Sequence, residues 1–232
     1  MNIVKSFTIT VGALFAAAAG LQAQSVISIN FDNGGNPITG STGAVNAGSW
    51  NTAAFGAAGS PVTTSNLLFD DGTASITDIS LSNRLNGTPG GNDQVLPGAT
   101  GEMLNLYTER NRNDGARINI TDITFSQYDV YLYYGSVFTE IVVNGVYQGS
   151  YLDNDDGSSF VEGSPTVEGN YARFSGLSGS TLEILTALDG DGNLSGEGFV
   201  FGAQIVAVPE PSAFALLAGM VGLTWVMVRR RA

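Results

Sequence analysis

Short runs in which apolar and polar residues alternate are the feature that most constrains the fold of this chain. Alternation with a period of two places successive side chains on opposite faces of a β-strand. Glycine, asparagine, serine and threonine separate the runs, and no long helical period appears before residue 213. The pattern predicts an all-β fold, an antiparallel β-sandwich. Its expected strands carry Ile27, Ile29 and Phe31; Leu104 and Leu106; Ile118 and Ile120; Ile123 and Phe125; Val130, Leu132 and Tyr134; Leu182 and Ile184; and residues 199–206.

A tight hairpin is predicted at Asn144-Gly145. Ile141 and Val143 precede this pair, and Val146 and Tyr147 follow it. Asparagine and glycine both tolerate a positive φ, which a two-residue hairpin turn requires.

Residues 34–64 are rich in glycine, alanine, serine and threonine. This stretch is expected to form a long loop with little regular structure.

The first residues have the layout of a secretory signal peptide. Lys5 is the only charge among residues 1–31, and an apolar stretch covers residues 7–19. Leu21-Gln22-Ala23 then offers a small residue for cleavage before Gln24. The expected signal peptide is residues 1–23, with Sec-dependent export as its consequence.

The last residues combine a proline-rich approach, an apolar segment and a basic end. Pro209, Glu210 and Pro211 come first, residues 212–228 carry no charge, and Arg229, Arg230 and Arg231 follow. The 17 residues from 212 to 228 would span roughly 25 Å as a helix, near the short end of what crosses a bilayer. We therefore expect a single transmembrane helix at residues 212–228 with the arginines on the cytoplasmic side. A buried C-terminal core helix is the alternative.

The tail of residues 208–232 resembles the PEP-CTERM sorting signal of exported bacterial proteins. The resemblance rests on the Pro-Glu-Pro motif, the single hydrophobic segment and the terminal arginines, in that order. It implies processing by a membrane protease of the exosortase type. It also implies that the protein is held transiently in the cytoplasmic membrane before it reaches the cell surface or the extracellular matrix.

The domain between the two ends, residues 24–207, is strongly acidic and lacks two chemically versatile residue types. It holds five arginines and no lysine against twenty acidic residues, which gives a formal charge of −15. Such a surface repels nucleic acid and anionic lipid. The absence of cysteine and histidine excludes disulfides, thiol nucleophiles, Ser-His-Asp triads and the usual zinc sites. An enzyme on this chain would have to use carboxylates, tyrosines or hydroxyls.

Four segments of the same domain look like those of the exported sandwich domains that often precede PEP-CTERM tails. Those domains are similar to galactose-binding-like and concanavalin-like jelly rolls, several of which bind carbohydrate, so the resemblance implies a jelly-roll-like sandwich. No carbohydrate-reading residue carries over. The segments are residues 128–134, 142–145, 174–179 and 202–206.

Three aromatic residues are candidates for a binding surface. Trp50 would either stack on a sugar or anchor its loop to the sandwich, and Phe55 nearby favours an anchoring cluster. Tyr131 and Tyr133 share the face of their strand opposite Val130 and Leu132. If that face is exposed, the two tyrosines form a contact strip.

One acidic loop is a candidate calcium site, and calcium is the only cofactor that the sequence suggests. Asp189, Asp191, Asn193, Ser195 and Glu197 alternate as in an EF-hand loop. The loop departs from that pattern, with leucine at position six and valine at position twelve. Asp153-Asn154-Asp155-Asp156-Gly157 is a second acidic cluster. Ordinary Asp/Gly/Asn turns explain both clusters equally well.

These observations favour a surface or matrix protein whose acidic sandwich serves adhesion or carbohydrate binding, with extracellular polysaccharide as a partner. The alternative is a secreted polysaccharide hydrolase that uses two carboxylates. No constellation of residues requires catalysis, so we expect a binding protein rather than an enzyme.

Replacement of Arg229, Arg230 and Arg231 by neutral residues is expected to weaken membrane retention and orientation, because the positive cluster favours the cytoplasmic side. Cell fractionation checks the retention. A reporter fused after Ala232 that is active only outside the cytoplasm would contradict the orientation.

Overall fold

The computed structural model describes residues 25–31, 38, 41–57, 59–83, 115–135, 139–152, 159–187, 199–209 and 211–229, with residues 83, 199 and 211–218 described by their backbone alone. The chain divides into two compact units, and Val26–Ala207 forms one of them. The strands of this unit are β1 (Val26–Phe31), β2 (Asn51–Ala53), β3 (Val62–Thr64), β4 (Asp78–Asn83), β5 (Ala116–Thr121), β6 (Tyr128–Gly135), β7 (Thr139–Val143), β8 (Val146–Tyr151), β9 (Tyr171–Leu177), β10 (Leu182–Thr186) and β11 (Phe199–Ala207).

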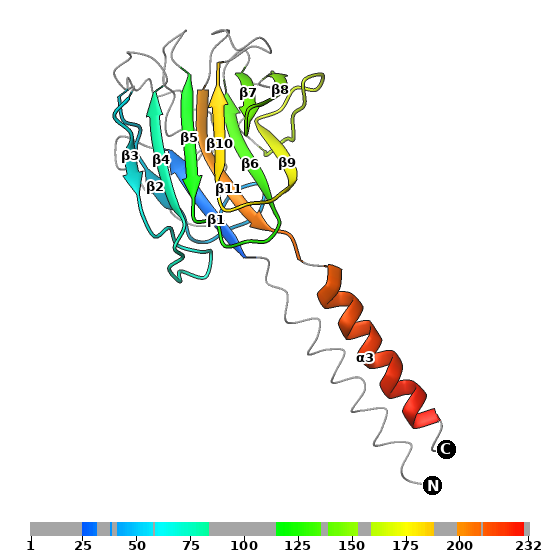
Figure 1. The fold of residues 1–232 in the computed structure, drawn as a ribbon. Coiled ribbons are helices and arrows are strands. Elements are labelled where there is room, and N and C mark those ends of the chain that lie inside the picture. Colours follow the sequence, from blue (N-terminus) through cyan, green and yellow to red (C-terminus); the bar gives the residue numbers. More distant parts are fainter. Residues whose placement is uncertain are drawn as a thin grey trace. The chain divides into compact units, whose positions relative to one another are not determined.

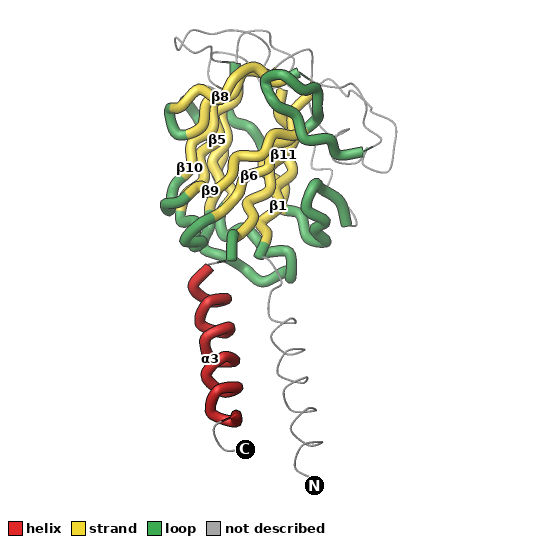
Figure 2. The backbone as a smooth tube through the Cα atoms, turned by 90° about the vertical axis from the view of Figure 1, so that its right-hand side faces the viewer, coloured by secondary structure: helices red, strands yellow, loops and turns green. Residues whose placement is uncertain are grey.

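The strands form two sheets that pack face to face (Figure 1). The five-stranded sheet has the order β2-β1-β11-β6-β9, and Figure 2 shows β1, β11, β6 and β9 side by side. The six-stranded sheet has the order β3-β4-β5-β10-β7-β8. The pairing of β1 with β2 is parallel, and the other pairings between these strands are antiparallel. The all-β sandwich prediction is therefore confirmed.

From β5 onward the chain passes repeatedly between the sheets. Strands β5, β7, β8 and β10 belong to the six-stranded sheet, whereas β6, β9 and β11 belong to the five-stranded sheet. Both ends of the unit also meet, because Val26 at the start of β1 is the register partner of Val206 near the end of β11.

The main hydrophobic core lies between the two sheets. On β6 the side chains of Tyr128, Val130, Leu132 and Tyr134 all enter it. Alternate positions of the other central strands do the same, as the period of two predicts. Six residues of the expected strands are at most 3% exposed: Ile29, Ile120, Leu132, Val143, Ile184 and Ile205. Leu104 and Leu106, of another expected strand, lie outside the described residues.

The predicted hairpin joins β7 to β8. Asn144 has φ 48° and Gly145 has φ 78°, the pair of positive values that a type I′ turn needs. The Asn144 side chain also accepts a hydrogen bond of 2.9 Å from the backbone N–H of Glu183. The turn is thus tied to the neighbouring strand β10.

One local prediction was wrong. Ile123 and Phe125 do not form a strand; they lie in the connection between β5 and β6, where Asp122 has a positive φ of 57°. Ile123 is nevertheless buried in the main core.

The described part of residues 34–64 has little regular structure, as expected, although the short strands β2 and β3 fall within it. Each of these strands has only three residues, too few for alternation to mark them.

The helix α3 covers Pro211–Arg229. It begins at a proline, which suits the first helical position because the missing N–H has no intrahelical partner there. At its other end the Arg229 guanidinium lies 5.2 Å from the centre of the Trp225 ring. Within the part of the chain that the structure describes, no helix is both long and apolar enough to cross a membrane. The predicted signal peptide, residues 1–23, lies outside the described residues.

Substitution of Leu132→Asp is expected to destabilise the sandwich by at least about 4 kcal/mol, because a carboxylate would enter the core without a partner. Thermal unfolding followed by circular dichroism measures this loss. Val146→Asp is the matched control, since Val146 is 60% exposed. Equal melting temperatures for the two variants would contradict the assignment of Leu132 to the core.

Candidate functional site

The outer face of the five-stranded sheet gathers aromatic side chains over β6 and β9. Tyr131 and Tyr133 project from β6 on the side opposite the main core, as predicted. Tyr171 on β9 is the cross-strand partner of Tyr133. Its ring centre lies 5.8 Å from that of Tyr131 and 5.9 Å from that of Tyr133. The pairing of β6 with β9 therefore brings three tyrosines together.

Tyr133 lies beneath the surface rather than on it. Its side chain is fully buried, and its ring packs against Phe160 at 5.4 Å and Trp50 at 6.4 Å between centres. The condition for a contact strip, exposure of this face, is therefore not met at Tyr133. A second layer of side chains covers this part of the sheet, a contribution that strand alternation alone does not reveal.

A buried polar network holds the loop around Ala44 and Val45, which we call the covering loop, against the sheet. The amide of Gln204, on β11, donates to Ser28 Oγ at 2.9 Å and to the Val45 carbonyl at 2.7 Å. Its oxygen accepts from the Val45 N–H at 3.1 Å and from the Tyr133 hydroxyl. The same hydroxyl accepts from the Ala44 N–H at 2.7 Å. One side chain thus binds the backbone of the covering loop and the sheet beneath it.

The covering loop needs a glycine where it crosses Gln204. Gly43 has φ +106°, and a Cβ at this position would lie 2.8 Å from the Gln204 amide atoms. A side chain would therefore be strained by the backbone and would also displace the amide.

Trp50 serves mainly as an anchor of this loop. Its ring joins a cluster with Ile38, Tyr133 and Phe201, and its Nε1–H donates to the Ala47 carbonyl at 3.2 Å. Phe55 lies elsewhere, in the main core, so the expected Trp50–Phe55 cluster does not form. Trp50 remains partly exposed.

The partly exposed area beside this cover consists of Tyr131, Tyr171, Arg173 and Glu162, which we call the tyrosine face. Both tyrosines are half-buried, whereas Arg173 and Glu162 are exposed. The Arg173 Cζ lies 5.5 Å from the centre of the Tyr131 ring. A backbone bridge sets Glu162 beside Tyr171. The face therefore offers two phenol rings together with a cationic donor and an anionic acceptor.

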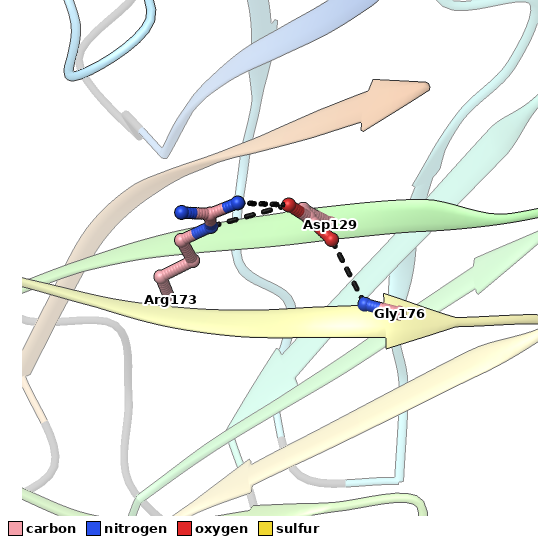
Figure 3. Close-up of polar contacts among 3 residues, drawn as sticks. All are labelled: Asp129, Arg173 and Gly176. Atoms are coloured by element: carbon pink, nitrogen blue, oxygen red, sulfur yellow. Dashed lines mark hydrogen bonds and ion pairs between the residues drawn. The ribbon is translucent and has the colours of Figure 1, made fainter. Parts of the chain in front are cut away.

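Asp129 holds Arg173 in place. Its Oδ2 accepts hydrogen bonds from Arg173 Nε at 3.1 Å and from Arg173 Nη2 at 2.6 Å. Its Oδ1 accepts from the Gly176 N–H at 2.8 Å, as Figure 3 shows. The Asp129 side chain is 7% exposed and that of Arg173 is 41% exposed. Both carboxylate oxygens are thus engaged: Oδ2 binds the guanidinium, and Oδ1 binds the backbone of β9.

The segment that carries Phe160 and Glu162 is fixed by Asn170. The buried Asn170 side chain donates to the Ser159 carbonyl at 2.7 Å and accepts from the Val161 N–H at 2.9 Å. These bonds flank Phe160, whose ring rests on Tyr133, and they hold Glu162 next to β9. The segment that contributes Glu162 to the tyrosine face is therefore held in position by Asn170.

The phenols of the face are neutral at physiological pH. Burial raises the pKa of Tyr131, and it also raises the pKa of Tyr171. The nearby Glu162 carboxylate raises the pKa of Tyr171 further, partly through a hydrogen bond. Burial likewise raises the pKa of Tyr133. The rings therefore present neutral hydroxyls, which suits binding through stacking and hydrogen bonds better than proton transfer.

The other predicted site residues are placed only in part. The calcium candidates Asp189, Asp191, Asn193, Ser195 and Glu197 lie outside the described residues, as does the cluster of residues 153–157. Within the described ranges no group of three or more acidic residues could hold a metal ion. Of the tail residues, Pro209, Pro211 and Arg229 are described, whereas Glu210, Arg230 and Arg231 are not.

Three residues of this face were not predicted from the sequence: Tyr171, Arg173 and Glu162. Residues 171–174 read Tyr-Ala-Arg-Phe, in which alternation would have placed Tyr171 and Arg173 on one face of a strand. For Glu162 the sequence holds no such signal, because its segment has no regular period.

The chain matches no protein-family model, no curated protein and no solved structure.

Substitution of Gln204→Leu is expected to lower the free energy of unfolding by about 2–4 kcal/mol, because several buried polar groups lose their partner. It should also loosen the covering loop and shift the Trp50 fluorescence to longer wavelength. Trp225→Phe provides the background for that measurement, since the chain has only two tryptophans. The control is Gln148→Leu, which removes a solvent-exposed hydrogen bond to the Val146 carbonyl. Unchanged Trp50 fluorescence in Gln204→Leu would show that the network does not hold the loop.

Proposed function

We propose that this chain is an exported cell-surface or extracellular-matrix protein whose β-sandwich binds carbohydrate through the tyrosine face. The observation that carries the proposal is the pair of half-buried rings of Tyr131 and Tyr171, set 5.8 Å apart beside exposed Arg173 and Glu162. An aromatic ring packs on the apolar face of a sugar, while adjacent polar groups bind its hydroxyls. The tyrosine face offers both kinds of contact.

The export part of the proposal rests on the two ends of the chain. Residues 1–23 would direct Sec-dependent secretion and be removed. Residues 208–232 would act as a PEP-CTERM sorting tail, recognised at Pro209, Glu210 and Pro211 by an exosortase-type protease. Residues 212–228 would serve as the transient membrane segment of this tail, because in the sequence their uncharged stretch ends at the basic cluster.

The architecture supports a binding role for residues 24–207. The passage of the chain between the sheets from β5 to β11 fits the jelly-roll interpretation, in which two Greek keys close a double sheet. A sheet face is rigid, and the side chains of Asp129, Tyr131 and Arg173 come from two adjacent paired strands. Such a face binds with little loss of conformational freedom.

The test is a glycan array probed with the purified protein, followed by titration of the bound glycans. Tyr131→Ala and Tyr171→Ala are each expected to weaken binding at least about tenfold, about 1.4 kcal/mol, because each removes part of the stacking surface. Tyr147→Ala is the matched control, since Tyr147 is 39% exposed on β8 of the other sheet.

If Tyr131→Ala and Tyr171→Ala weaken glycan binding no more than the control Tyr147→Ala does, the binding surface lies elsewhere. Measurable hydrolysis of a polysaccharide that a single carboxylate substitution abolishes would overturn the binding function and favour the hydrolase.

A further inference from the structure

We infer that the tyrosine face selects uncharged sugar polymers, with Arg173 and Glu162 as the residues that read their hydroxyl groups. This inference rests on the proposed carbohydrate-binding function and narrows it to one chemical class. Three observations carry it: the fixed guanidinium of Arg173, the charge balance of the face and the position of the exposed Glu162 carboxylate.

The Arg173 guanidinium is oriented before any ligand arrives. Asp129 engages Nε and Nη2, and in Figure 3 the third nitrogen points away from the carboxylate. That nitrogen, Nη1, forms no hydrogen bond with any residue in the described ranges. Because Cζ lies 5.5 Å from the Tyr131 ring centre, a sugar that contacts the tyrosines comes within reach of the Nη1 donors. The pre-set orientation reduces the entropy lost on binding.

The net charge of the face disfavours anionic sugars. The positive charge of Arg173 is balanced by Asp129, with Nη2 and Oδ2 2.6 Å apart. Glu162 then leaves one negative charge exposed beside Tyr171. A uronate or sulfate at this place would meet that carboxylate within a domain of formal charge −15. The mutual repulsion, strongest at low salt, lowers the affinity for such ligands.

The same groups suit a hydroxyl-rich neutral ligand. A sugar hydroxyl both donates and accepts hydrogen bonds, so it accepts from Arg173 Nη1 and donates to the Glu162 carboxylate. Hydrogen bonds to charged groups are stronger than those between neutral groups. The neutral hydroxyl of Tyr131 adds a further polar group beside the ring. A nucleic acid does not fit, because its phosphates would meet the same negative charge.

The experiment titrates the full chain, held in detergent micelles, with two sets of oligosaccharides of equal length. One set contains neutral hexoses and N-acetylhexosamines, and the other contains oligo-uronates; each is measured by calorimetry at low salt and at about 0.15 M salt. At least one neutral ligand is expected to bind at least about tenfold more tightly than any uronate. Added salt should reduce the difference in affinity between neutral ligands and uronates, because it weakens the repulsion between the uronates and the acidic domain.

Two pairs of variants locate the selectivity. Glu162→Ala and Arg173→Met are each expected to weaken binding of the neutral ligand about tenfold, and Glu162→Ala should also raise the affinity for uronates. Glu183→Ala and Arg117→Met are the matched controls, because Arg117 and Glu183 form an ion pair of 3.7 Å at similar exposure on the other sheet. Arg173→Met removes the partner of the buried Asp129 carboxylate and can unfold the protein. In that case the exposed Glu162→Ala variant decides the test.

The outcomes separate the two proposals. Uronates bound as tightly as neutral sugars, with binding lost in Tyr171→Ala, would overturn the inference and leave the carbohydrate-binding function standing. Equal affinity of Glu162→Ala and Glu183→Ala for the neutral ligands would also overturn the inference and leave the carbohydrate-binding function standing. Failure of both oligosaccharide sets to bind would overturn the proposed function, and the inference with it.

Discussion

Strand β6 supplies alternate side chains to two different environments, and the rest of the structure is arranged around that division. Val130, Leu132 and Tyr134 enter the core between the sheets, whereas Asp129 and Tyr131 reach the opposite face. A shift of one residue in the pairing of β6 would exchange these two sets. Burial of the apolar set therefore fixes the place of the tyrosine face as firmly as it fixes the core.

On the outer face of the five-stranded sheet, the covering loop encloses a second, smaller buried region. Buried Gln204 and Tyr133 link the sheet to the loop around Ala44 and Val45 through hydrogen bonds, and a small aromatic cluster closes over them. Hydrogen-bonded polar groups are costly to leave unpaired in such a place. The cover is thus specific in its position, and it ends where Tyr131 and Tyr171 become accessible.

Alternation along the chain predicted the strands that carry branched or aromatic residues at every second position. It placed Ile29, Leu132 and Ile205 in the core correctly, because one face of each sheet must be buried. It failed for β2 and β3, which are too short to show a period. It could not reveal the burial of Tyr133, which depends on contacts with Trp50 and Phe160, far away in the sequence. The Asp129–Arg173 pair likewise depends on the register of β6 against β9.

The position of β11 has a mechanical consequence. This strand pairs with β1 on one side and with β6 on the other, and the chain leaves it at Ala207 on the way to α3. A pull on the C-terminal end along the strand loads both rows of hydrogen bonds in shear. Many bonds must then stretch together before any one breaks, whereas a pull across the strands would open them one after another. Because β11 lies directly beside β6, a load between the tail and the proposed ligand crosses one interstrand ladder to reach Tyr131, and a second ladder, between β6 and β9, to reach Tyr171.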